Sequence, residues 1–344
     1  MTARRPAGRG LLAGGNWIID AVKLIDTWPP QDALATIVGQ SWGNGGSPYN
    51  VLKDLARLGA PFPLEAVGLV GDDANGRLIR QDCRVHHIDT AQLRVTGAAA
   101  TSYTDVMTVQ STGRRTFFHQ RGANALLAPE HFDFRRTRAR RFHLGYALLL
   151  DTLDAPGADG APRLAEVFRA ARAAGLATSL DCVSDTSDRF RTVVAPVLPL
   201  VDVLFANDYE TEKLTGVPLR RGGALTRRTV EEAVRALLRL GVRDWALVHF
   251  PEGACAGSAR GPMVWQPSVK VPAAAVAGLA GAGDAFAAGV LLGLHEGWPM
   301  ARCLRLGVCA AAASLAHPTC SESVRPAAEC LALGRRHGFN LPPA

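Results

Sequence analysis

The sequence contains little lysine and few aromatic residues. Among its 344 residues, lysine occurs only at positions 23, 53, 213 and 270, and aromatic side chains make up 6%. The formal net charge of +7 therefore comes almost entirely from arginine. A basic cluster at 135–141 lacks the interleaved aromatic residues of many nucleic-acid surfaces, so we interpret it as a solvated loop. We expect no nucleic-acid partner.

Cysteine is present, but its number and spacing do not match a disulfide or zinc framework. The seven cysteines are scattered and form no C-x-x-C motif. Cys83 with His86, and His317 with Cys320, have ligand-like spacing, but each is a single pair far from the other, so we attribute both to chance. We therefore expect reduced thiols, no zinc site and a cytoplasmic protein.

Long uninterrupted hydrophobic runs are missing as well. The most apolar stretch, 271–294, contains Pro272, several glycines and Asp284, and a charge inside lipid is costly. The first residues include arginines but no apolar segment that ends in a cleavage site. We expect neither a membrane span nor a signal peptide.

Predicted strands and helices alternate along most of the chain, beginning with a strand expected over 11–19 and including a helix expected over 188–198. This rhythm predicts an α/β fold, with a mostly parallel central sheet flanked by helices on both faces, in a single domain over 11–330. Two segments, 21–43 and 99–121, do not fit the rhythm. In the second, polar and apolar residues alternate on both sides of a Ser-Thr-Gly turn, which is typical of a hairpin. We expect both segments to form a small β lid that stands off the main sheet.

Residues 281–284 read Gly-Ala-Gly-Asp and open an apolar helical pattern. Small residues at a helix start leave backbone N–H groups free, and the helix dipole adds positive potential there. Gly281, Ala282 and Gly283 therefore suit the charge of a phosphoryl group in transfer, and Asp284 is placed to accept a proton from an attacking hydroxyl. An ordinary N-cap with close-packing glycines fits the local pattern equally well.

Other phosphate-binding and nucleophile motifs are missing. The sequence has no G-x-x-x-x-G-K-[ST] loop and no G-x-S-x-G elbow, and Phe286 stands where a dinucleotide fingerprint needs its last glycine. A P-loop enzyme, an α/β-hydrolase and a Rossmann dehydrogenase are therefore disfavoured.

Two further polar sets follow predicted strands. Asn207 and Glu210 open a helix on one face, where hard oxygen ligands suit Mg²⁺, although a capping box explains them better when they are taken alone. Asp20 follows the first strand, and a glycine pair at 45–46 precedes a helix that carries Asn50. This second set could bind hydroxyls, although a turn aspartate and a helix-face amide are the simpler interpretations.

Taken together and in order, these motifs resemble one known family. They are G-N-x-x-x-D at 15–20, G-G-x-x-x-N at 45–50, VGLVGDDANG at 67–76, GRRTFFHQRGAN at 113–124, FHLGY at 142–146, N-x-x-E at 207–210 and GAGDAFAAG at 281–289. The set resembles the ribokinase family, also called the phosphofructokinase-B family of carbohydrate kinases, over roughly residues 11 to 325.

The resemblance implies an ATP-dependent kinase that phosphorylates a hydroxyl of a sugar, with a lid that forms a homodimer interface in many members. Asp284 would be the catalytic base, and Gly281, Ala282 and Gly283 would form the anion hole. Asp20, Gly45, Gly46, Asn50 and Asn124 would hold the sugar. Asn207, Glu210 and Gly253 would serve the nucleotide, with Glu210 acting on Mg²⁺ indirectly or through water.

The sequence departs from the family pattern around its nucleotide site. The family usually has D-T-x-G-A-G-D, but Gly278 stands in place of the first aspartate, which commonly binds an activating monovalent cation. The nucleotide loop is altered at 249–254 and is one residue shorter. We therefore expect weak or absent potassium activation.

The substrate remains open at this stage. A nucleoside kinase would need an aromatic cradle, which Trp17, Trp42 and Phe118 could supply. A phosphosugar kinase could use three arginines in the second lid segment, at positions 114, 115 and 121. The altered nucleotide loop also leaves a catalytically silent sugar- or nucleotide-binding member as an alternative, which the retained Asp284 argues against.

Overall fold

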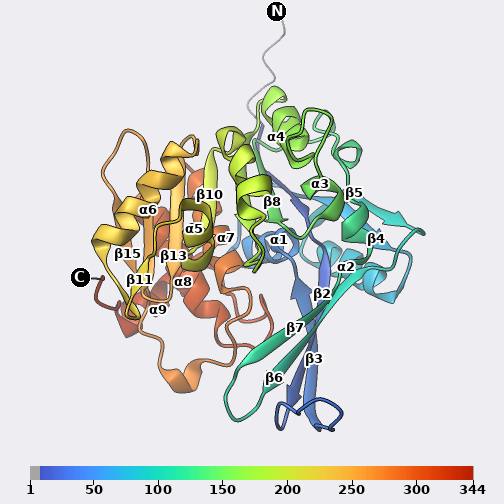
Figure 1. The fold of residues 1–344 in the computed structure, drawn as a ribbon, viewed down its shortest axis with the longest axis vertical. Helices are drawn as coiled ribbons and strands as arrows, with labels where there is room; N and C mark the ends of the chain where they lie inside the picture. Colours follow the sequence, from blue (N-terminus) through green and yellow to red (C-terminus); the bar gives the residue numbers. More distant parts are fainter. Residues whose placement is uncertain (1–7, 344) are drawn as a thin grey trace, which may run out of the picture.

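The computed structural model describes residues 8–343, and its centre is a nine-stranded sheet (Figure 1). The strand order is β15, β14, β13, β10, β9, β8, β1, β4 and β5. The strands from β13 to β5 are parallel, whereas β14 and β15 add an antiparallel edge. In chain order the strands are β1 (Leu11–Gly15), β4 (Leu64–Gly71), β5 (Ile88–Thr96), β8 (Arg141–Ala147), β9 (Ala177–Cys182), β10 (Val203–Asn207), β13 (Trp245–Phe250), β14 (Gly253–Gly257) and β15 (Val264–Pro267).

Helices pack on both faces of this sheet, which confirms the predicted α/β layering (Figure 1). On one face, Phe168 and Leu237 pack with the strand residue Leu180. On the other, Leu55 and Leu291 pack with Phe205. The helices are α1 (Ser47–Leu58), α2 (Ala74–Val85), α3 (Asp151–Asp154), α4 (Leu164–Ala173), α5 (Asp208–Thr215), α6 (Arg227–Arg239), α7 (Ala282–His295), α8 (Met300–Ser314) and α9 (Ala327–His337), and a short hairpin joins β11 (Arg220–Arg221) to β12 (Ala224–Leu225). No helix within 8–343 is long and apolar enough to cross a bilayer.

A second, four-stranded sheet stands off the main body, and we call it the lid (Figure 1). Its strand order is β3, β2, β6, β7, and β2 pairs in parallel with β6. The predicted hairpin is present as β6 and β7, which pair antiparallel. The lid strands are β2 (Ile18–Ile25), β3 (Ile37–Gly45), β6 (Ser102–Val109) and β7 (Arg115–Gln120).

Two expected boundaries were wrong. The first strand, predicted over 11–19, ends at Gly15, where φ of +128° lets the chain leave the main sheet, and Asp20 consequently lies inside lid strand β2. The helix predicted over 188–198 is instead a pair of short π and 3₁₀ turns. Pro196 and Pro199 fall in that segment, and proline has no N–H for a regular helix.

Candidate active site

Most of the predicted site residues meet in one cavity of about 490 Å³ between the lid and the carboxyl ends of the parallel strands. Such ends are the usual ligand-binding edge of an open α/β sheet. The cavity lies where β8, β9 and β10 end and where α7 begins. The predicted residues that line it are Asp20, Gly46, Asn50, Asn207, Glu210, Gly281, Ala282, Gly283 and Asp284.

Asp284 is buried in the first turn of α7, and its two carboxylate oxygens have different surroundings. Oδ2 accepts hydrogen bonds from Asn50 Nδ2 at 2.8 Å and from the Tyr146 hydroxyl at 2.6 Å. Oδ1 is buried and has no hydrogen-bond partner in the described part of the chain. The N-cap position belongs to Gly281, and no side chain caps the helix, so the N-cap interpretation of Asp284 was wrong.

The pKa of Asp284 is raised to about 6 by burial, and the hydrogen bonds that Asn50 and Tyr146 donate to Oδ2, together with the nearby Ser47 hydroxyl, oppose this rise. Ser47 also bonds to His143 Nε2 at 3.1 Å, and His143 Nδ1 contacts Ser179 Oγ at 2.9 Å. Burial lowers the pKa of His143 to about 3, so this ring is neutral near pH 7. The carboxylate is thus held by neutral polar groups, which leave its charge available at Oδ1.

The start of α7 forms a cradle of backbone beside Asp284. Gly281 has φ of +72°, and a Cβ there would lie 2.5 Å from Cys320 Cβ, so only glycine fits. A Cβ at Gly283 would approach His249 Cε1 to 3.2 Å. The first N–H groups of a helix have no intrahelical acceptor. Because residues 281–283 line the cavity, these N–H groups are positioned to bind an anion there.

Asn207 and Glu210 form a capping box at the start of α5. Asn207 Oδ1 accepts from the Glu210 N–H at 2.9 Å, and Glu210 Oε2 accepts from the Asn207 N–H at 2.9 Å. Glu210 Oε1 accepts from Ser184 Oγ at 2.8 Å. Burial raises the pKa of Glu210 to about 7 and raises the pKa of Asp181 on β9 well above its usual range. The site therefore brings several buried acidic groups together.

Asp20 lies on lid strand β2 and faces the cavity. It pairs with Gly43 on β3 and with Thr104 on β6. Thr104 in turn pairs with His119 on β7, so these residues lie in one row across the lid. Burial raises the pKa of Asp20 to about 7, and a hydrogen bond with Thr104 partly opposes this. Gly45 leaves the space that Asp20 occupies, because a Cβ there would lie 2.4 Å from Asp20 Oδ1.

Comparison with known proteins identifies the family. The family model described as "pfkB family carbohydrate kinase" matches residues 16–327. This chain belongs to that family. It is 31% identical over 277 residues to an ATP-dependent ribose-1-phosphate kinase of Halopiger xanaduensis, covering 80% of this chain and 81% of the relative. A ribokinase of Arabidopsis thaliana is 29% identical over 295 residues, which cover 83% of this chain and 69% of that protein.

Solved structures show the same fold. The Arabidopsis thaliana ribokinase solved with ribose and ATP has a TM-score of 0.75 and 23% identity, and covers 95% of this chain and 98% of its own. A ribokinase of Thermotoga maritima also has a TM-score of 0.75, with 20% identity and coverage of 95% and 99%. The ribokinase-like sheet and the lid of this carbohydrate kinase are therefore shared with proteins of low sequence identity.

A second, larger cavity of about 760 Å³ adjoins the first and shares Asn207, Ala282 and Gly283 with it. Its walls are mainly apolar, with Val271, Val276, Leu279, Ala312 and Leu315 among them, and Gly253 and His249 lie at its edge. The kinase thus has two chambers joined at the N-terminus of α7, and the smaller one contains the buried carboxyl group of Asp284.

Asn124 lies elsewhere than expected. It is fully buried and does not line either cavity. Its Oδ1 accepts from the Trp17 N–H at 3.1 Å, and its Nδ2 donates to the Trp17 carbonyl at 3.3 Å. Asn124 therefore fixes the backbone that leads into β2 rather than facing a substrate.

The aromatic cradle considered for a nucleoside is not assembled. Trp17 is fully buried and donates from Nε1 to the Val67 carbonyl. Trp42 pairs with Ala21, one residue out of phase with Asp20, so it faces away from the cavity. Phe118 is also out of phase with His119, and it stacks on Trp28 with ring centroids 6.1 Å apart.

Sequence reasoning missed several residues that support the base. Tyr146 belongs to the quoted FHLGY motif and Ser47 to the glycine-rich segment before α1, but neither was given a role. His143 and Asp181 were also missed. Their position at or near the ends of buried strands was the available signal, because such ends meet at one edge of a parallel sheet.

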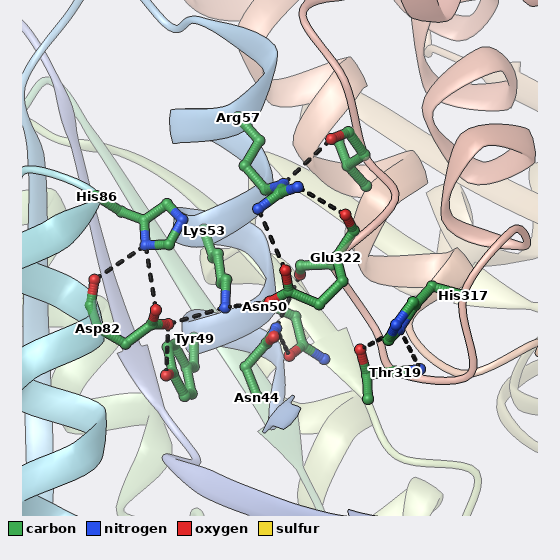
Figure 2. A network of polar contacts seen from close by, with 12 residues as sticks. Asn44, Tyr49, Asn50, Lys53, Arg57, Asp82, His86, His317, Thr319 and Glu322 are labelled. Carbon is green, nitrogen blue, oxygen red and sulfur yellow. Dashed lines mark hydrogen bonds and ion pairs between the residues drawn. The ribbon is translucent and has the colours of Figure 1, made fainter. Parts of the chain in front are cut away.

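A network of ion pairs fixes the helix that carries Asn50 (Figure 2). Lys53 on α1 is 5% exposed, and its Nζ lies 2.8 Å from Glu322 Oε1 and 3.0 Å from Asp82 Oδ2. Figure 2 also shows Asn44 Nδ2 donating to Asn50 Oδ1 at 2.7 Å. The network joins α1 to α2 and to the loop that precedes α9, so three distant segments position the residue that binds Asp284.

Proposed function

We propose that this carbohydrate kinase uses Asp284 as the general base in transferring the γ-phosphoryl group of ATP to a sugar hydroxyl. The observation that carries the assignment is the unpartnered Oδ1 of Asp284, buried beside the free N–H groups of the first turn of α7. A base needs a free oxygen, and the transferred group needs donors within reach of the same point.

The proposed phosphoryl transfer takes place beside Asp284 Oδ1. The substrate hydroxyl gives its proton to Asp284 Oδ1 while its oxygen forms a bond to the γ-phosphorus. The bond from the γ-phosphorus to the bridging oxygen breaks, and ADP leaves with that oxygen. The N–H groups of residues 281–283 receive the charge on the transferred phosphoryl oxygens. The products are a sugar phosphate and ADP.

The two chambers fit ATP and Mg²⁺. The cavity of about 760 Å³ offers apolar walls for a nucleobase, and the buried carboxyls of Asp181 and Glu210, whose pKa values are raised mainly by burial, are oxygen groups of the kind that suit Mg²⁺. Both Glu210 oxygens already accept hydrogen bonds, so we propose that Glu210 and Asn207 hold water ligands of Mg²⁺ rather than the ion itself. The ion would neutralise charge on the triphosphate.

The substrate is a small sugar or a phosphorylated sugar. The relatives' names cover both classes, since one is called a ribose-1-phosphate kinase and others ribokinase or fructokinase. Asp20, with Thr104 beside it, is placed to bind sugar hydroxyls at the lid side of the cavity.

We also propose that the outer face of the lid forms a homodimer interface. Trp42 and Phe118 point away from the cavity and are 57% and 50% exposed, and Trp28, which stacks on Phe118, is 47% exposed. A thin sheet with an apolar outer face is unfavourable in water unless something covers it. A second copy of the same sheet is a self-complementary cover.

Replacement of the base tests the function. We expect Asp284→Asn to lower kcat by about 10²–10⁴-fold in an ADP-release assay, because a positioned base contributes that much, while ATP binding persists. Asp188→Asn is the matched control, since the side chain of Asp188 is fully exposed. Near wild-type kcat in Asp284→Asn would remove the catalytic assignment.

A further inference from the structure

The inner face of lid strand β7 carries two buried side-chain nitrogen atoms, one from an arginine and one from a histidine. Alternation along the strand places Arg115, Phe117 and His119 on one side, and Phe117 and His119 line the cavity. Arg115 Nη1 and His119 Nε2 are these atoms, and neither has a hydrogen-bond partner among residues 8–343. The buried, charged Arg115 guanidinium is unfavourable without an acceptor, so this face of the lid is suited to a ligand that supplies one.

Arg115 differs from its two neighbouring arginines. Arg121 forms an ion pair with Asp151 at 2.9 Å, and Arg114 lies exposed at the tip of the hairpin. Arg115 forms no ion pair within residues 8–343, and its guanidinium carbon lies 5.7 Å from the centre of the Phe117 ring. It is close enough to Asp20 to influence the pKa of that carboxyl. Arg115 therefore bends back over Phe117 toward the sugar chamber.

The cavity into which Arg115 is directed is lined by acidic groups. The ionisable carboxyls that line it are Asp20, Asp181, Glu210 and Asp284, and no lysine or arginine within the described residues lines it. Arg115 thus brings positive charge to the lid end of an otherwise acidic cavity. The free N–H groups of α7 and Asp284 lie in the same cavity, at the helix end. A phosphate group on the sugar would supply an acceptor for the unpartnered Arg115 Nη1.

We propose that the sugar substrate already carries a phosphate group, which Arg115 and His119 bind at the lid while a hydroxyl at the other end of the sugar faces Asp284. This inference rests on the proposed kinase function and names its substrate class. The hydroxyl proton passes to Asp284, the γ-phosphoryl group joins the hydroxyl oxygen, and ADP leaves. The product is a sugar bisphosphate.

The test compares matched sugars in one ADP-release assay. Ribose is compared with ribose 1-phosphate and fructose with fructose 1-phosphate, and gluconate supplies a carboxylate in place of a phosphate. We expect kcat/KM for each phosphorylated sugar to exceed that of its neutral partner. A charge-assisted contact accounts for about 10- to 100-fold.

Variants of two adjacent arginines then assign the effect. Arg115→Ala should lower kcat/KM for the phosphorylated sugars by about 10- to 100-fold, mainly through KM, and should lower it far less for the neutral sugars. Arg115→Lys keeps the charge and should recover part of the loss. Arg114→Ala is the control, because this side chain is exposed one residue away, and it should change neither class.

The outcomes separate the substrate class from the kinase function. A preference for the neutral sugars or for gluconate overturns the phosphate assignment and leaves the kinase function intact. The same holds if Arg115→Ala lowers turnover of neutral and phosphorylated sugars equally. Absence of phosphoryl transfer to every sugar contradicts the proposed function itself and, with it, this inference.

Discussion

At the scale of single residues, the difference between the two oxygens of Asp284 is created by residues far away in the sequence. Asn50 is 234 positions from Asp284, and Tyr146 is 138 positions away. Both donate to Oδ2, and neither reaches Oδ1. The free oxygen is therefore a product of the tertiary structure, and it sets how strongly the base holds a proton.

The pH profile should report this arrangement. The reaction needs ionised Asp284, so activity should be present above its pKa of about 6 and should fall as the pH drops through that value. The Tyr146 hydrogen bond favours the ionised form. We expect Tyr146→Phe to move the acid limb of the kcat/KM profile to higher pH by about one unit. This magnitude follows from the free energy of a hydrogen bond to a charged group.

Tyr103→Phe provides the comparison, because Tyr103 is 38% exposed on the other face of the lid. Its acid limb should match that of the wild type. An unchanged limb in Tyr146→Phe would show that Tyr146 does not tune the base.

The sequence alone predicted which residues gather around the base, but not how they are bonded. The GAGD segment and Asn50 were predicted because their spacing is local or belongs to a family motif. The roles of Tyr146 and Ser47 depend on the convergence of β8, α1 and α7, which no local pattern encodes. Asn124 shows the reverse case, because a residue in a matching motif can serve the backbone rather than the ligand.

At the scale of elements, the loop that leads into α7 departs from its family at Gly278. A Cβ at this position would lie 2.9 Å from Pro318 Cα and 3.0 Å from the His317 carbonyl oxygen. The loop 317–324 therefore packs directly against the backbone at 278. An aspartate side chain has no space there in this arrangement.

Potassium should consequently have little effect on the rate. The measurement compares activity in potassium and in a bulky organic cation at equal ionic strength, with a fixed concentration of Mg²⁺. We expect closely similar kcat values in the two salts. Strong stimulation by potassium would show that other oxygen atoms bind the ion without the missing aspartate.

The alternation of polar and apolar residues predicted only part of the lid. The β6–β7 hairpin was predicted because alternation and a turn are local signals. The start of β2 at Ile18 was not, because strands of the main sheet and of the lid have the same local pattern, and only the turn at Gly15 separates β1 from β2. The position of Asp20 in the lid depends on that turn.

At the scale of the whole molecule, the apolar outer face of the lid determines the assembly that we expect. We predict a homodimer in sedimentation experiments at micromolar concentration. Trp42→Asp should shift the protein to a monomer, because it places a charge on the outer lid face that the proposed dimer would bury.

Val85→Asp is the control for this experiment, since Val85 on α2 is 66% exposed but lies outside the lid. It should leave the dimer intact. A wild-type protein that sediments as a monomer would contradict the dimer proposal directly.

The junction between β3 and α1 has a consequence for turnover. Gly46 alone separates the lid strand from the helix that carries Ser47 and Asn50, and its φ of +81° brings it so close to Asn16 that a Cβ would lie 2.1 Å from the Asn16 carbonyl oxygen. A movement of the lid would therefore reach the groups that hold Asp284 through this single residue. A substrate too short to touch the lid would bind without closing the lid over the cavity. Such a substrate should lose kcat as well as affinity, so the rate of the chemical step would depend on substrate length.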